Sequence, residues 1–157
     1  MKTHSLAEQL KNRLQKSGQT VSVAESITGG QLQAVITSTS GASTYFAGGV
    51  TAYNIDQKVK LLGVDREHAA AVNCVSERVA REMAVGVSRL FGTDIGLATT
   101  GYAESCPQQG IDKPFAWIAI SADGVVESAK VQASCFERIE IQTEIASVVL
   151  AKLLKLP

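Results

Sequence analysis

One stretch, residues 21–30, limits more than any other what this chain can fold into. An alternating apolar run gives way there to small polar residues and then to the pair Gly29 and Gly30. Apolar residues with the three- and four-residue spacing of a helix come next, at Leu32, Val35 and Ile36. The stretch therefore predicts a buried strand, a turn and a helix, with Ser26 and Thr28 in the first helical turn.

The start of this predicted helix is a candidate ligand-binding site. Unpaired backbone N–H groups and the positive end of the helix dipole attract an anion or an oxyanion at such a position. Gly29 and Gly30 allow a ligand to come close to the backbone because they carry no side chain. We therefore take Ser26, Thr28, Gly29 and Gly30 as candidate binding residues.

Size and charge exclude several classes of protein. The 157 residues, 45% of them apolar, predict one globular domain over residues 1–157. The 15 basic and 15 acidic residues balance without forming a long block of one sign, so we expect no nucleic-acid partner and no membrane partner. No apolar run reaches signal-peptide or transmembrane length, which predicts a soluble intracellular protein.

The three cysteines, Cys74, Cys106 and Cys135, favour a cytoplasmic location. Their number is odd, and no Cys-x-x-Cys spacing occurs. This pattern is typical of reduced thiols and not of a disulfide framework or a zinc site. We therefore predict a cytoplasmic protein without a metal centre.

Turn and capping residues divide the rest of the chain into elements. A capping box at Ser5 predicts an opening helix as far as Gly18. Two further helices are predicted to begin at the N-caps Asn54 and Ser76, and a last one covers residues 141–152. An Asp-Gly turn joins the last two strands in a hairpin. The predicted strands cover residues 21–24, 50–53, 95–98, 115–122 and 125–133.

This order of elements predicts an α/β fold with three layers, α/β/α, around a mixed, mostly parallel five-stranded sheet. Ligands of such sheets usually bind at the carboxyl ends of the parallel strands. Polar residues are predicted at these ends and should converge on one edge of the sheet. They are Ser26 and Thr28, Tyr53 and Asn54, and Thr100 and Gly101.

Ser26 is a candidate nucleophile, and a nucleophilic serine needs a base. His4 lies in the N-terminal tail and His68 in a predicted surface segment, so a Ser-His-Asp triad is not expected. A partly buried lysine with a lowered pKa can serve as the base, and Lys58 is the candidate. Glu25 is a candidate for orienting Lys58 or a substrate amine. The alternative is that Ser26 only caps a helix and that the two charged residues are solvated.

Several short motifs follow one another along nearly the whole chain. They are Ala24-Glu25-Ser26-Ile27-Thr28-Gly29-Gly30, Phe46-Ala47-Gly48-Gly49-Val50-Thr51-Ala52-Tyr53-Asn54 with Lys58, Leu61-Leu62-Gly63-Val64, Val75-Ser76-Glu77 and Thr100-Gly101-Tyr102-Ala103. Together they resemble the CinA C-terminal domain family. The resemblance implies a single α/β domain, a homodimer and, for active members, nicotinamide mononucleotide deamidase activity. That reaction hydrolyses the carboxamide to nicotinate mononucleotide and ammonia without a metal or a cofactor.

The resemblance also implies roles for individual residues. It places the family's nucleophile on Ser26 and its lysine base on Lys58, with an oxyanion held by backbone N–H groups of residues 28–30. The substrate is then nicotinamide mononucleotide or a related amide. The candidate substrate-binding residues are Glu25, Thr28, Gly29, Gly30, Tyr53, Asn54, Thr100 and Gly101.

The sequence departs from the family pattern near the expected substrate. Ile27 stands where the family usually has Cys, and the third motif, Thr-Gly-x-Ala-Gly-Pro in the family, here ends in Glu104 and Ser105. A carboxylate at this place repels a phosphate. Arg138 is the candidate match for the arginine of a Gly-Asp-Arg run before the last helix. We therefore expect a divergent member, either an amidohydrolase with an altered phosphate pocket or a noncatalytic relative that binds a nucleotide-like ligand or a protein partner.

Overall fold

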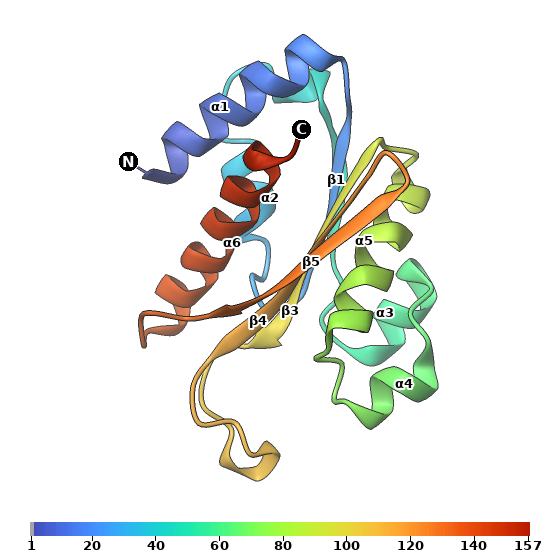
Figure 1. The fold of residues 1–157 in the computed structure, drawn as a ribbon, viewed down its shortest axis with the longest axis vertical. Helices are drawn as coiled ribbons and strands as arrows, with labels where there is room; N and C mark the ends of the chain where they lie inside the picture. The colour runs from blue at the N-terminus through green and yellow to red at the C-terminus, as the bar shows by residue number, and fades with distance from the viewer. Residues whose placement is uncertain (1) are drawn as a thin grey trace.

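Within the described residues 2–157, the computed structural model is built on a five-stranded sheet with helices on both faces (Figure 1). The strands lie side by side in the order β2-β1-β3-β4-β5. Their bounds are Val21–Glu25 for β1, Phe46–Thr51 for β2, Ile95–Tyr102 for β3, Phe115–Ala122 for β4 and Val125–Gln132 for β5.

The strand directions bring three carboxyl ends together. β1 pairs in parallel with β2 and with β3, whereas β4 is antiparallel to both of its neighbours. The direct return from β4 to β5 uses Asp123 and Gly124, both at positive φ, as a two-residue hairpin turn requires. The α/β fold with a mixed sheet is thus confirmed, and β1, β2 and β3 end at the same edge.

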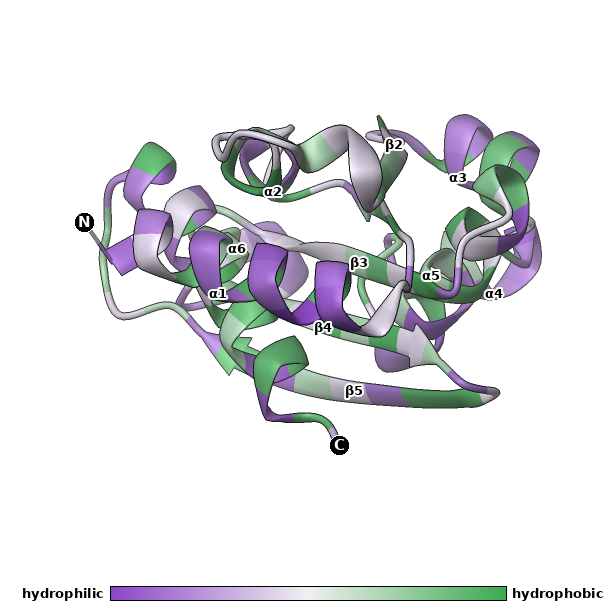
Figure 2. Cartoon of the chain, turned by 90° about the horizontal axis from the view of Figure 1, so that it is seen from above, coloured by the Kyte–Doolittle hydropathy of each residue, from purple (hydrophilic) through white to green (hydrophobic). Residues whose placement is uncertain are grey.

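Three helices cover one face of the sheet: α1 (Lys2–Ser17), α2 (Gln31–Ile36) and α6 (Arg138–Lys155). Leu10 and Leu14 of α1 are buried because their four-residue spacing puts both on its inner side. The rest of α1 is polar, and the helix is mostly purple in Figure 2. An apolar core therefore lies between these helices and the sheet.

The other face carries α3 (Ile55–Leu62), α4 (Arg66–Ala71) and α5 (Glu77–Phe91). α5 packs so closely on β3 that a Cβ atom at Gly96 would overlap the carbonyl oxygen of Ala84. The fully buried apolar side chains that β1, β3 and β4 contribute to this core are small, those of Ala24, Ala98 and Ala119.

Some boundaries differ from the predicted ones. α1 begins before Ser5, so this residue lies inside the helix and does not cap it. β2 begins at Phe46, which pairs with Val21 of β1, and ends at Thr51, so it differs from the predicted 50–53 at both ends. Its glycines allow close packing: a Cβ atom at Gly49 would lie 2.6 Å from Cγ2 of Val23. β3 extends to Tyr102 because β4 pairs along its whole length.

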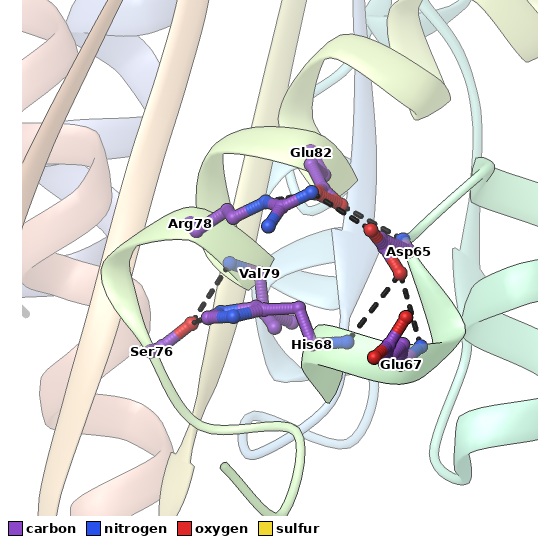
Figure 3. A network of polar contacts seen from close by, with 7 residues as sticks. All are labelled: Asp65, Glu67, His68, Ser76, Arg78, Val79 and Glu82. Carbon is purple, nitrogen blue, oxygen red and sulfur yellow. Dashed lines mark hydrogen bonds and ion pairs between the residues drawn. The ribbon is translucent and has the colours of Figure 1, made fainter. Parts of the chain in front are cut away.

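The surface segment around His68 forms a short helix, α4. Asp65 caps it by accepting the first helical N–H groups at 3.0 and 3.4 Å, and Arg78 of α5 pairs with the same carboxylate at 2.9 Å (Figure 3). Ser76 caps α5 as predicted, and its Oγ lies 2.8 Å from Nε2 of His68. These contacts hold together the two ends of the connecting segment, residues 72–75.

Candidate active site

A cavity of about 200 Å³ lies at the edge where β1 and β3 end. Four residues predicted at this edge line it, Ser26, Tyr53, Thr100 and Gly101, together with the predicted base Lys58. Its wall also contains residues that the sequence analysis did not place there: Asn73, Cys74, Val75, Tyr102 and Ala103. Arg138, at the start of α6, lines it as well.

Ser26 and Lys58 are in direct contact within this cavity. Nζ of Lys58 donates a hydrogen bond to Oγ of Ser26 at 2.8 Å. Lys58 is 1% exposed and Ser26 is 8% exposed, so water has little access to either. The contact depends on the start of α3, where Asn54 accepts the N–H group of Gln57 at 3.0 Å and fixes the direction of the helix. Asn54 therefore acts as the predicted N-cap and lies outside the residues that line the cavity.

Burial favours the neutral form of the Lys58 amine. It lowers the pKa of Lys58 below its ordinary value of 10.5, and the electrostatic effect of Cys74 partly opposes this shift. Nζ also donates to the carbonyl oxygens of Ala52 at 2.7 Å and Tyr53 at 3.3 Å. A neutral amine has only two N–H groups, which these two carbonyls can accept; the hydrogen bond with Ser26 is then reversed, and the serine hydroxyl donates to the lone pair of Nζ. A neutral Lys58 amine would therefore lie within hydrogen-bond distance of the Ser26 hydroxyl, as the predicted roles of the two residues require.

Glu25 does not reach the cavity, and the expectation that it orients Lys58 or a substrate amine is not met. Its side chain is fully buried and accepts the N–H groups of Gly30 at 3.2 Å, Leu32 at 2.8 Å and Gln33 at 3.0 Å. Helix α2 begins at Gln31, so the N–H groups that donate to Glu25 lie at the start of this helix. The positive end of α2 is thus already occupied by a carboxylate of the chain itself.

The backbone around Ser26 also differs from the prediction. Ser26 and Thr28 lie in the turn before α2 and not in its first turn. Gly29 donates its N–H to the carbonyl of Ser26 at 3.1 Å and Gly30 donates to Glu25, so neither is free to hold an oxyanion. Among residues 2–157, the N–H groups of Ile27 and Thr28 donate no hydrogen bond to another part of the chain. Of the predicted oxyanion donors, residues 28–30, only the N–H of Thr28 therefore remains a candidate, and the N–H of Ile27 joins it.

Thr28 holds the turn in place. Its Oγ1 lies 2.8 Å from Oγ1 of Thr99 in β3, and the same Thr99 oxygen accepts the N–H of Ser26 at 3.4 Å. All three residues are buried. The hydroxyl of Thr28 therefore fixes the position of Ser26 and lies outside the cavity lining.

The segment between α4 and α5 forms a second wall of the cavity. Asn73 and Cys74 have φ angles of 52° and 62°, in the left-handed region that few residues other than glycine adopt. The Oγ1 of Thr100 donates to the carbonyl of Cys74 at 2.7 Å, and Nδ2 of Asn73 donates to the hydroxyl of Tyr102 at 3.2 Å. Two hydrogen bonds thus join β3 to this segment in the cavity wall.

Arg138 lies where the cavity meets solvent and is bound on two sides. Its Nη2 donates to the hydroxyl of Tyr53 at 2.9 Å, and its Nη1 lies 3.4 Å from Oε1 of Glu104. Tyr53 is 58% exposed. Tyr53 was predicted at the site from the sequence, but no local pattern linked it to Arg138, which lies far from it along the chain.

The role of Glu25 can be checked by substitution. Glu25→Ala should lower the free energy of unfolding by about 2–3 kcal/mol, because it removes a helix cap and leaves three N–H groups without their acceptor. Glu25→Gln, which keeps one acceptor oxygen and nearly the same volume, should lose less. Urea denaturation of the three proteins measures both differences, and an alanine variant as stable as the wild type contradicts the capping role.

Sequence similarity to known proteins extends along nearly the whole chain. Residues 3–156 match the family model of the CinA C-terminal domain. The chain belongs to this family. The CinA-like protein of Rippkaea orientalis is 43% identical over 128 residues, which cover 79% of this chain and 30% of that protein. Protein MG115 of Mycoplasma genitalium is 48% identical over 99 residues, 63% of either chain.

Solved CinA structures share the fold over almost their full length. Competence damage-inducible protein A of Klebsiella pneumoniae superposes with a TM-score of 0.89 at 28% identity, covering 98% of this chain and 95% of that one. The competence/damage inducible protein CihA of Agrobacterium tumefaciens gives 0.91 at 26% identity, covering 98% and 94%. By contrast, the present chain spans less than a third of the length of the Rippkaea orientalis protein.

Ile27, at the position where the family pattern has cysteine, contacts both the cavity and the apolar core. It lines the cavity next to Ser26, yet it is only 3% exposed and packs in the core beneath α6. Its carbonyl accepts from Nε2 of Gln142 in α6 at 3.1 Å. The isoleucine therefore supplies apolar packing behind Ser26, whose contact with Lys58 is present beside it.

Two further features concern the described part of this CinA chain as a whole. No three side chains of His, Cys, Asp or Glu converge within residues 2–157 in a way that suits a metal ion. In the same residues, no helix is both long enough and apolar enough to cross a membrane. The absence of a metal, the homodimer and the cytoplasmic location remain predictions from the sequence.

Proposed function

We propose that this chain is an amidohydrolase that cleaves the carboxamide of nicotinamide mononucleotide or of a related compound. The observation that carries the proposal is the buried Lys58 amine, 2.8 Å from the hydroxyl of Ser26 in a cavity. Membership of the CinA C-terminal domain family supports the choice of substrate class, because the resemblance implies nicotinamide mononucleotide deamidase activity for active members.

The first half of the reaction forms an ester. Lys58, as a neutral amine, takes the proton of Ser26, and Oγ of Ser26 forms a bond to the amide carbon. The carbonyl oxygen becomes an oxyanion, which the N–H groups of Ile27 and Thr28 stabilise. Lys58 then gives its proton to the amide nitrogen, the C–N bond breaks and ammonia leaves.

The second half releases the acid. A water molecule gives a proton to Lys58, and its oxygen attacks the ester carbon. Ser26 leaves with the proton that Lys58 returns, and the product is a carboxylic acid, ionised at neutral pH. Since Lys58 accepts and returns one proton in each half, its pKa must lie near the working pH, which is the direction in which burial moves it.

A noncatalytic relative that binds a nucleotide-like ligand or a protein partner is the second candidate function. The contact between Arg138 and Glu104 favours it, because the guanidinium at the cavity mouth is already paired. Under this alternative, Ser26 and Lys58 form a buried polar contact without turnover. The two functions differ in whether ammonia appears.

Ammonia release from purified protein distinguishes them. We expect release from nicotinamide mononucleotide or from nicotinamide riboside, which lacks the phosphate, and we expect none from nicotinate mononucleotide, which has no amide. Nicotinate mononucleotide is therefore the control for contaminating ammonia. No release from either amide refutes the nicotinamide substrate and leaves a noncatalytic or differently specific relative.

A further inference from the structure

The mouth of the cavity holds a cation that the chain itself neutralises. Of the described residues that line the cavity, only Lys58 and Arg138 have basic side chains. Lys58 is buried against Ser26 with a lowered pKa, so Arg138 is the cation that a ligand meets at the solvent side. Glu104 lies against it, with 3.4 Å between Nη1 and Oε1.

Both ends of the Arg138 guanidinium have partners. One terminal nitrogen donates to Tyr53 and the other faces Glu104. Arginine binds a phosphate through two parallel N–H groups, so a phosphate that binds through the two terminal nitrogens of Arg138 competes with these partners. The displaced Glu104 would then remain close to the phosphate as a second negative charge.

The ion pair between Arg138 and Glu104 contributes little to the stability of the fold. The side chains of Arg138 and Glu104 are 48% and 76% exposed, and an exposed pair of this kind adds little stability. Its effect on a charged ligand is larger, because a phosphate monoester carries up to two negative charges and each one is repelled by the carboxylate. Glu104 therefore acts on ligands more than on folding.

The cavity is also small. Its volume of about 200 Å³ is below the ~300–1,000 Å³ of sites that enclose drug-sized ligands. It can hold the amide end of a ligand at Ser26 while the remainder of the ligand lies at the mouth, beside Arg138, Tyr53 and Glu104. The residues at the mouth therefore distinguish ligands by the charge of this outer part.

From these contacts we infer that Glu104 is a specificity-determining residue that makes the site select amides whose outer part carries no phosphate. The ligand class is a nucleoside-like carboxamide and not a nucleotide. The inference rests on the proposed function for the claim that the reacting group is an amide. The charge preference of the mouth is independent of the proposed function, because it can be measured with a ligand that has no amide.

Binding of ribose 5-phosphate to the full chain tests the charge preference alone, because this probe has a phosphate and no amide. Glu104→Gln should bind it about tenfold more tightly than the wild type at low ionic strength, and added salt should reduce the gain. Arg138→Gln in the Glu104→Gln background should remove the gain. The matched control is Glu127→Gln, which neutralises an exposed carboxylate on β5 and should change nothing. Isothermal titration calorimetry measures all four proteins.

The outcomes separate the two claims. If Glu104→Gln binds ribose 5-phosphate no better than the wild type, or if the gain persists without Arg138, the inference is wrong whether or not the chain releases ammonia. Faster ammonia release from nicotinamide mononucleotide than from the riboside also overturns it, although the proposed reaction then stands. The inference is supported if Glu104→Gln binds ribose 5-phosphate more tightly than the wild type and if the added Arg138→Gln change removes this gain, even where no amide is hydrolysed.

Discussion

Ammonia release by Ser26→Ala is expected to fall at least about a thousandfold below that of the wild type. The alanine variant lacks the oxygen that forms the ester, whereas the buried amine and the N–H groups of Ile27 and Thr28 remain. Since only one hydroxyl is lost, the variant should fold normally, as circular dichroism can show. The initial rate with each amide, normalised to protein concentration, is the quantity to compare.

Ser38→Ala is the matched control for this loss. Ser38 also carries a hydroxyl in a single short hydrogen bond, to the carbonyl of Val35 at 2.7 Å, but it is exposed and far from the cavity lining. Its variant should keep the full rate. A Ser26→Ala protein that releases ammonia as fast as Ser38→Ala rules out Ser26 as the nucleophile.

Lys58→Met should reduce the rate by about 10²–10⁴-fold, the range expected when a general base is lost. Methionine has a similar length and fills the apolar space around the lysine stem, but it cannot accept the proton of Ser26. Its stability has two opposed contributions: the buried amine no longer has to be desolvated, and the carbonyl of Ala52 loses its donor. We therefore expect a folded variant whose melting temperature can be measured beside its rate.

Lys60→Met, two residues further along α3, provides the comparison. Lys60 is exposed, so the same change there removes a charge without touching Ser26. Equal rates for the two variants, each with a cooperative melting curve, would contradict the base role of Lys58. A slow Lys58→Met beside an active Lys60→Met supports it.

Local signals predicted the elements that place the site. Asn54 and Ser76 cap helices as expected, and Gly63 and Gly92 end them in the left-handed conformation that glycine adopts without strain. Capping depends on neighbouring residues only, so the sequence carries the whole signal. The position of Lys58 on the inner side of α3 follows from such a cap and the helical period.

The parts that sequence analysis missed depend on contacts distant along the chain or on one turn. Glu25 ends a strand like many solvated carboxylates, and only the geometry of the turn before α2 directs it to the N–H groups of Gly30, Leu32 and Gln33. Asn73 held a usable signal, because asparagine tolerates the left-handed conformation better than most residues. The pairing of Arg138 with Glu104 joins two segments whose relative position no local pattern fixes.

The central claim is that a neutral Lys58 activates Ser26, and the pH dependence of kcat/KM tests it most directly. Nicotinamide riboside is the better substrate for this measurement because it has no phosphate that titrates near neutral pH. Burial lowers the pKa of Lys58, and the base works only when deprotonated, so kcat/KM should rise with pH and level off below the ordinary lysine value of 10.5. A profile that is flat from about pH 5 to about pH 10 in the wild type, or a rise that persists unchanged in Lys58→Met, would contradict the account.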